Sequence, residues 1–257
     1  MLTSNPFAAL AASISPAVMQ TYAVVMIVLV AAGTLFDVVH KGSAKYFFEN
    51  WRKSKNKGAK KLGGGELVSI AIQTGVVDVL ASGEFCNARR RIAHLLTMYG
   101  FVIYVVATAV MVFSYSTPEM PTPAFLPQLW WLGGLMTCLG GYWFWFFIRV
   151  DVVAEGNSPL RFVRADLFIV SLLVSVTLGL IWAAAGAGVG VLFGLYVIAT
   201  TVLFGSVTWS KFAHMFFKPA AAFEKRVSHA NESRSNLPGP ADKPETFGIA
   251  REQPRNY

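Results

Sequence analysis

The chain has 257 residues, of which 54% are hydrophobic and only 14% are charged, and its formal net charge is +8 at pH 7. This composition excludes a soluble globular domain and indicates a polytopic membrane protein. In such a chain the positive charge is a signal of orientation, with some attraction to anionic lipid, and it does not indicate nucleic-acid binding.

Five hydrophobic segments are long enough, or nearly so, to be membrane spans, since a helix needs about 20 apolar residues to cross about 30 Å of hydrocarbon. They cover residues 16–39, 93–114, 129–148, 167–183 and 188–208, and none contains Lys or Arg. The last two are separated by an Ala- and Gly-rich stretch at 183–188, which predicts a turn. The expected fold is therefore all-α: a five-helix transmembrane bundle.

The segments between the spans alternate between basic ones and ones free of Lys and Arg. This alternation places all 22 Lys and Arg residues on one side of the membrane. Because cytoplasmic loops retain Lys and Arg near the ends of spans, the basic side is the inside. The sequence thus predicts that the N-terminus lies outside and the C-terminus inside.

The predicted parts are a short uncharged outer segment (1–15), a membrane domain (16–217) that includes a basic inner loop (41–92), and a disordered polar tail (218–257). Within the inner loop, Gly63, Gly64 and Gly65 end a basic run. The following stretch, 66–80, has the pattern of a short amphipathic helix. Such a helix lies along the membrane surface or under a partner, and the pattern leaves both open.

Histidines are the side chains on which redox chemistry in this chain would depend. His40, His94 and His214 each lie next to the inner end of a predicted span, whereas His229 lies in the polar tail. Two imidazoles on facing helices can take both axial positions of a b-type haem. Histidine at a membrane interface is also common without any ligand, so the spacing alone leaves an ordinary interfacial role open.

Two local patterns resemble a known family. Residues 89–101 read R-R-R-I-A-H-L-L-T-M-Y-G-F, a basic stretch, a helix-opening His94 and a following Gly-Phe. The stretch K-F-A-H-M at 211–215, with Pro219 after it, is the second pattern. Together with the run-up at 78–86, these resemble the second and fifth spans of the nitrate-reductase gamma-type cytochrome b family. That family includes the membrane domain of the quinone-interacting oxidoreductase C subunit.

The chain departs from this family in two ways. Family members carry two histidines on each haem-bearing helix, whereas the second and fifth spans here carry one each, so one haem b is the most that the resemblance implies. The C subunit also has an iron–sulfur domain with repeated Cys motifs, which this sequence lacks. A membrane part alone resembles the membrane anchors of dissimilatory adenylylsulfate reductases in sulfur-oxidising bacteria.

The resemblance implies a site and a partner. His94 and His214 would be the axial ligands of the haem iron, with His40 as an alternative ligand or part of a quinone site. The partner would be a cytoplasmic flavin and iron–sulfur adenylylsulfate reductase, docked on the basic inner loop at the bacterial inner membrane, with quinone as electron acceptor.

Other readings remain open at this stage. Arg89, Arg90 and Arg91 would pair with haem propionates or, as the reading we favour, serve only as orienting charge. Asp37 and His40, three residues apart, would exchange protons with quinone or simply cap the span. For the whole chain, the alternatives are a haem-free structural anchor and a small-solute transporter.

Overall fold

The computed structural model of the chain describes residues 2–40, 45, 47–49, 51–52, 60–83, 85, 87–149, 162, 166–208 and 214–233, and gives the backbone alone for 214–217. The chain divides into two compact units. The bundle unit comprises residues 1–41 and 87–214, and the loop–tail unit comprises residues 42–86 and 215–257. Described residues of the predicted inner loop and of the predicted tail thus fall in the same unit.

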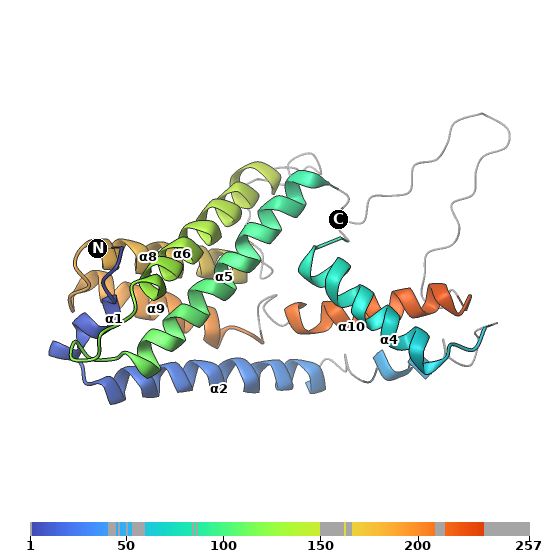
Figure 1. Cartoon of the computed structure of the whole chain (residues 1–257), viewed down its shortest axis with the longest axis horizontal. Coiled ribbons are helices and arrows are strands. Elements are labelled where there is room, and N and C mark those ends of the chain that lie inside the picture. The colour runs from blue at the N-terminus through green and yellow to red at the C-terminus, as the bar shows by residue number, and fades with distance from the viewer. Residues whose placement is uncertain are drawn as a thin grey trace. The chain divides into compact units, whose positions relative to one another are not determined.

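The bundle unit is built from long apolar helices (Figure 1). These are α2 (Pro16–His40), α5 (Ala88–Ser114), α6 (Phe125–Trp143) with its continuation η3 (Phe144–Ile148), α8 (Leu167–Ala184) and α9 (Val191–Gly205). Within the described part of the chain, four are long and apolar enough to cross a membrane, and these are α2, α5, α6–η3 and α8. The described residues form helices and no strands, as expected, and the four helices indicate a multi-pass membrane protein.

The helix α9 is shorter than its predicted span of 188–208. Its 15 residues rise about 22 Å at 1.5 Å per residue, less than the hydrocarbon thickness of about 30 Å. The predicted turn before it is confirmed. Gly186 and Ala187 have φ values of +99° and +55°, and the N–H of Ala187 bonds the carbonyl of Trp182 at 3.0 Å. Such a hydrogen bond satisfies a carbonyl at the end of α8 and is typical of a helix C-terminus. The next helix, α9, starts at Val191.

Helices that follow one another along the chain run in alternating directions in the bundle unit. The start of α2 meets the end of α5, where Gln20 donates to the carbonyl of Val112 at 3.2 Å. The carboxyl-terminal half of α6 meets the beginning of α8: a Cβ atom placed on Gly141 would touch the side chain of Leu173. Ser175 of α8 bonds Thr200 of α9 across an antiparallel pair. The ends of α2 and α6–η3 and the beginnings of α5 and α8 therefore lie at one end of the bundle unit, the "histidine end".

The helices α5 and α6 touch backbone to backbone along their length. A Cβ atom placed on Gly133 would lie 2.6 Å from the backbone nitrogen of Tyr104 and 2.8 Å from the carbonyl oxygen of Gly100. One placed on Gly140 would lie 2.6 Å from the carbonyl oxygen of Ala93. Small residues permit such close approach in lipid, where helices associate mainly by packing. Figure 1 shows the two helices side by side.

Residues 2–14 are folded, although the sequence analysis expected only a short outer segment. They form α1 (Pro6–Ala9) and η1 (Leu10–Ala12), and the side chains of Phe7 and Leu10 are buried. The carboxamide of Asn5 accepts from the N–H of Phe7 and donates to the carbonyl of Tyr115 at 2.7 Å. This segment therefore fills the end of the bundle unit opposite the histidine end.

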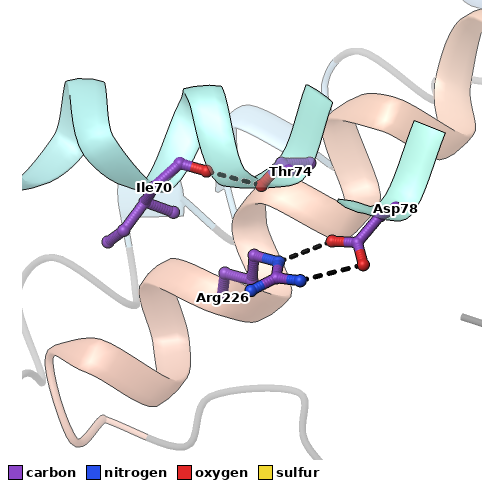
Figure 2. Close-up of polar contacts among 4 residues, drawn as sticks. All are labelled: Ile70, Thr74, Asp78 and Arg226. Carbon is purple, nitrogen blue, oxygen red and sulfur yellow. Dashed lines mark hydrogen bonds and ion pairs between the residues drawn. The ribbon is translucent and has the colours of Figure 1, made fainter. Parts of the chain in front are cut away.

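The loop–tail unit includes α4 (Gly64–Gln73), its π-helical continuation η2 (Thr74–Leu80) and α10 (His214–Ala230). The predicted amphipathic helix at 66–80 is thus confirmed. Figure 2 shows how η2 meets α10: the Arg226 guanidinium donates to both carboxylate oxygens of Asp78, at 2.5 and 2.9 Å. The ring of Trp51 stacks on Phe223 of α10, with centroids 5.4 Å apart.

The tail differs from the expectation of disorder, since α10 remains helical through Ala230. The reason is burial: Val227 and Ser228 are buried, and Arg226 pairs with a carboxylate 148 positions earlier in the chain. Pro219 lies inside α10, where its missing N–H removes one hydrogen bond of the helix. Residues 234–257 lie outside the described part, so the prediction for them is untested.

Candidate functional site

The candidate haem ligands fall into three different structural situations. His40 is the last residue of α2 and is exposed, with its ring stacked on Phe36 of the same helix at a centroid distance of 5.0 Å. His94 lies in the second turn of α5 and is half-buried. Both occupy the histidine end. The side chain of His214 lies outside the described residues, so the structure does not test the predicted pair of His94 with His214.

The three arginines form the first turn of α5, which begins five residues earlier than the predicted span. Asn87 explains this start, since its side-chain oxygen accepts from the N–H groups of Arg89 and Arg90 at 2.9 and 3.5 Å. Cations at a helix N-terminus oppose the helix dipole, so helix stability does not explain their presence. Arg89 and Arg91 are exposed and Arg90 is half-buried. Neither of the two predicted roles, propionate contact or orienting charge, is tested by this exposure.

Asp37 and His40 do not share one environment. Asp37 is only 4% exposed, whereas His40 is exposed and lies against Phe36. Side chains three positions apart point in directions that differ by about 60° around the helix axis. This difference puts Asp37 inside the bundle and His40 outside. The structure therefore gives no support to a proton-exchanging pair, and Asp37 is the buried acid of this end of α2.

The space around His94 limits where a porphyrin could bind. At the preceding residue, Ala93, α5 contacts Gly140 so closely that α5 and α6 leave no gap wide enough for a ring. A haem ligated by His94 must therefore lie on a flank of α5 that faces away from α6. The structure shows His94 half-buried on α5, and does not test whether it binds haem iron. The described residues hold no cluster of three or more His, Cys, Asp or Glu side chains that would bind a separate metal ion.

No protein-family model, curated protein or solved structure matches the chain. The family resemblance of residues 89–101 and 211–215 therefore stays a prediction.

The aromatic run at 142–147 lies near the histidine end and faces largely outward. Phe144, Phe146 and Phe147 are 38%, 59% and 75% exposed. Trp145 lies under the guanidinium of Arg149, 4.1 Å from the ring centroid. Aromatic rings at the end of a span are typical of the belt at the membrane–water interface. Their exposure favours this belt over the walls of an enclosed quinone pocket.

The interior of the bundle unit contains hydroxyl groups that the sequence analysis did not single out. Ser175 bonds Thr200 at 2.8 Å, Tyr142 bonds Thr177 at 2.8 Å, and Tyr104 donates to Tyr196 at 3.3 Å. Each bond joins two different helices, and each is worth about 0.6 kcal/mol on average in a membrane protein. A signal was present in the sequence: Ser171 and Ser175 on α8, and Tyr196 and Thr200 on α9, recur at a spacing of four.

These interhelical groups are all neutral, so they hold helices together without providing a charged path. The indole of Trp182 stacks on Tyr196 at 5.6 Å and that of Trp130 on Tyr104 at 4.9 Å. Phe7 of the N-terminal segment contacts both indoles. Aromatic side chains therefore fill the half of the bundle unit that lies away from the histidine end. This packing does not favour a transporter with a water-filled path.

The loop–tail unit provides the candidate docking surface. Arg52 of the basic run is exposed, while Lys53, Lys55 and Lys57 lie outside the described residues. Hydrogen bonding to Asp78 raises the pKa of Arg226 above its usual value, so this guanidinium stays charged. The hydrogen bond from Lys60, followed by that from the N–H of Gly63, lowers the pKa of Glu66. Both acids of 66–80 are thus engaged with partners inside the unit.

Proposed function

We propose that this chain is the membrane subunit of an oxidoreductase complex, which holds a cytoplasmic reductase at the inner face of a bacterial inner membrane. The observation that carries the proposal is the division into two units. A multi-pass bundle is joined to a separate folded unit, made from both of the long segments outside the apolar helices. An anchor needs these two parts: a bundle that stays in lipid, and a water-facing surface that binds the soluble subunit.

In the proposed topology, the chain crosses the membrane five times, with its N-terminus outside and its C-terminus inside. The alternating directions of helices that follow one another along the chain support it, because α9 runs opposite to α8 as a fifth crossing would. Residues 206–208 after α9 are also apolar or neutral and contact α2 through Val207 and Gly33. The one-sided distribution of Lys and Arg supplies the orientation.

The proposed partner is a flavin and iron–sulfur adenylylsulfate reductase, and the proposed electron acceptor is quinone. This part rests on the resemblance of residues 89–101 and 211–215 to the nitrate-reductase gamma-type family. The basic run at 52–61 would bind an acidic surface of the reductase, since charge complementarity mainly steers encounter and sets orientation.

A haem b is the proposed cofactor, with His94 and His214 as axial ligands and His40 as the alternative to one of them. When bound, it would supply one-electron transfer between the reductase and quinone. The residues of the chain would hold the iron and set its depth near the inner surface. Arg90 is the best placed of the three arginines to contact a propionate, because it alone is half-buried.

The reduced-minus-oxidised visible spectrum of protein purified from native membranes tests the redox part. We expect a b-type α band that is lost completely in His94→Ala, because removing an axial ligand opens the iron coordination. His229→Ala is the matched control, since His229 is an exposed histidine of α10, and it should leave the band intact. A wild-type spectrum without any α band would overturn the haem proposal.

A haem-free structural anchor is the second candidate. It is favoured by the close contact of α5 and α6 beside His94, which removes one of the flanks on which a porphyrin could bind. The same spectrum distinguishes the haem-binding subunit from the structural anchor, because a structural anchor has no α band. In that case His94→Ala should also leave the reductase attached to the membrane as in the wild type.

A further inference from the structure

The two helical segments of the loop–tail unit expose faces of opposite character. On α10 the exposed side chains are mostly polar or charged and recur every three or four residues: Lys218, Ala221, Lys225 and His229. On α4 and η2 one set of exposed side chains at the same kind of spacing is wholly apolar, beside a second exposed set that is polar, Glu66, Ser69 and Gln73. The apolar set is Val68, Ile72, Val76 and Leu80, each between 53% and 63% exposed. We call these four the "apolar stripe".

The apolar stripe is not a surface left over from poor packing of α4. The opposite face of the same segment does pack within the unit, since Thr74 is buried and Leu67, Ile70, Asp78 and Val79 are half-buried. Asp78 is held on that inner face by Arg226 (Figure 2). A helix that packs on a protein and faces water carries polar or charged side chains on its outer face. The apolar stripe lies on the outer face of this segment.

Charge around the stripe suits an anionic lipid surface. The two acids of 66–80 are neutralised within the unit, Glu66 by Lys60 at 2.7 Å and Asp78 by Arg226. The segment that follows the stripe leads into Arg89, Arg90 and Arg91 at the start of α5. Basic residues beside an amphipathic helix attract the negatively charged lipids of a cytoplasmic leaflet.

The length of chain between the stripe and α5 allows the stripe to reach the surface of the membrane that α5 would cross. Leu80 and Ala88 are eight residues apart, so about 28 Å separates them at most, even when the chain is fully extended. The chain is shorter than this, because it turns back at once: the N–H of Gly83 bonds the carbonyl of Val77 at 2.7 Å. A Cβ atom on Gly83 would lie 2.8 Å from that carbonyl oxygen, so the tight turn requires glycine.

We infer that the apolar stripe of α4 and η2 lies in the lipid interface of the membrane that α5 crosses. The loop–tail unit would then rest on this membrane through α4, with Lys225 and His229 of α10 exposed to water. The inference requires only that α5 is a membrane span. It holds whether or not the chain binds haem or a reductase, so its test is independent of the proposed function.

Spin labels on the full-length chain test this placement. Single cysteines are introduced by Ile72→Cys and Val76→Cys, in a background of Cys86→Ser and Cys138→Ser, and the labelled chain is reconstituted in nanodiscs of phosphatidylethanolamine and phosphatidylglycerol. The ratio of oxygen to water-soluble nickel accessibility should be several-fold higher at both positions than at the control, Lys225→Cys on α10. All three sites are exposed, so labelling should leave the fold intact.

The outcomes separate lipid from a protein partner. If the labels at 72 and 76 are as accessible to nickel as the label at 225, the stripe faces water and the inference is wrong. If they become protected only when cytoplasmic extract is added, a protein covers the stripe, and the inference is also wrong. Protection in nanodiscs without extract, with the highest oxygen accessibility at 68, 72, 76 and 80 in a residue-by-residue scan, supports it.

Discussion

Replacing Gly133 with leucine should unfold the bundle unit or separate α5 from α6. The first atom of the new side chain would lie 2.6 Å from the backbone nitrogen of Tyr104 and 2.8 Å from the carbonyl oxygen of Gly100. Backbone atoms of a helix cannot move aside as a flexible side chain can, so the two helices must part. Overpacking commonly costs 1–3 kcal/mol, and we expect at least about 3 kcal/mol here because no neighbouring atom can yield.

Thermal unfolding in one detergent, followed by tryptophan fluorescence, measures this effect. Gly194→Leu is the matched control, because Gly194 also lies in an apolar helix but a Cβ atom there meets nothing within 4 Å. The control should unfold near the wild-type temperature, whereas Gly133→Leu should unfold far below it or fail to accumulate. Equal unfolding temperatures for the two variants would show that α5 and α6 do not touch in this way.

Removing the guanidinium of Arg226 should release α10 from η2. The Asp78–Arg226 pair is bidentate, and the side chains of Arg226 and Asp78 are only 27% and 13% exposed, so it should contribute more than an ordinary surface ion pair. We expect Arg226→Ala to cost the loop–tail unit about 2 kcal/mol, which is roughly a thirty-fold faster amide exchange. Hydrogen exchange of peptides covering 74–80 and 218–230 measures it.

Two further variants make this test specific. Lys225→Ala removes the neighbouring, exposed cation and should leave the exchange rates unchanged. The double swap of Asp78→Arg with Arg226→Asp should recover much of the lost protection, because the pair re-forms with reversed polarity. Protection that is lost equally in both single alanine variants of Arg226 and Lys225 would contradict the contact between η2 and α10.

The long apolar helices and the turn between α8 and α9 could be predicted because their signals are local. Runs of apolar residues set the helix lengths, and Gly186 permits the positive φ value that ends α8. The start of α5 was missed by five residues, because hydrophobicity does not reveal a cap. Asn87 supplies that cap to the first turn of α5, which contains Arg89, Arg90 and Arg91. Three adjacent charges argue against a membrane span, so the prediction left this turn out of the helix.

The helical part of the tail could not be predicted, since its stability depends on distant residues. Arg226 and Asp78 are 148 positions apart, and nothing near α10 in sequence indicates this contact. Residue spacing in the sequence also did not predict which side chains of the candidate site are buried. Asp37 and His40 have the spacing of helix neighbours, yet only the packing of α2 decides that Asp37 is buried and His40 exposed.

Fractionation of native host cells, with and without this chain, tests the proposed membrane anchor most directly. Adenylylsulfate reductase should sediment with the membranes when the chain is present. It should move to the soluble fraction when the chain is deleted, and return when the chain is supplied again. A reductase that sediments with membranes to the same extent in both strains would contradict the account.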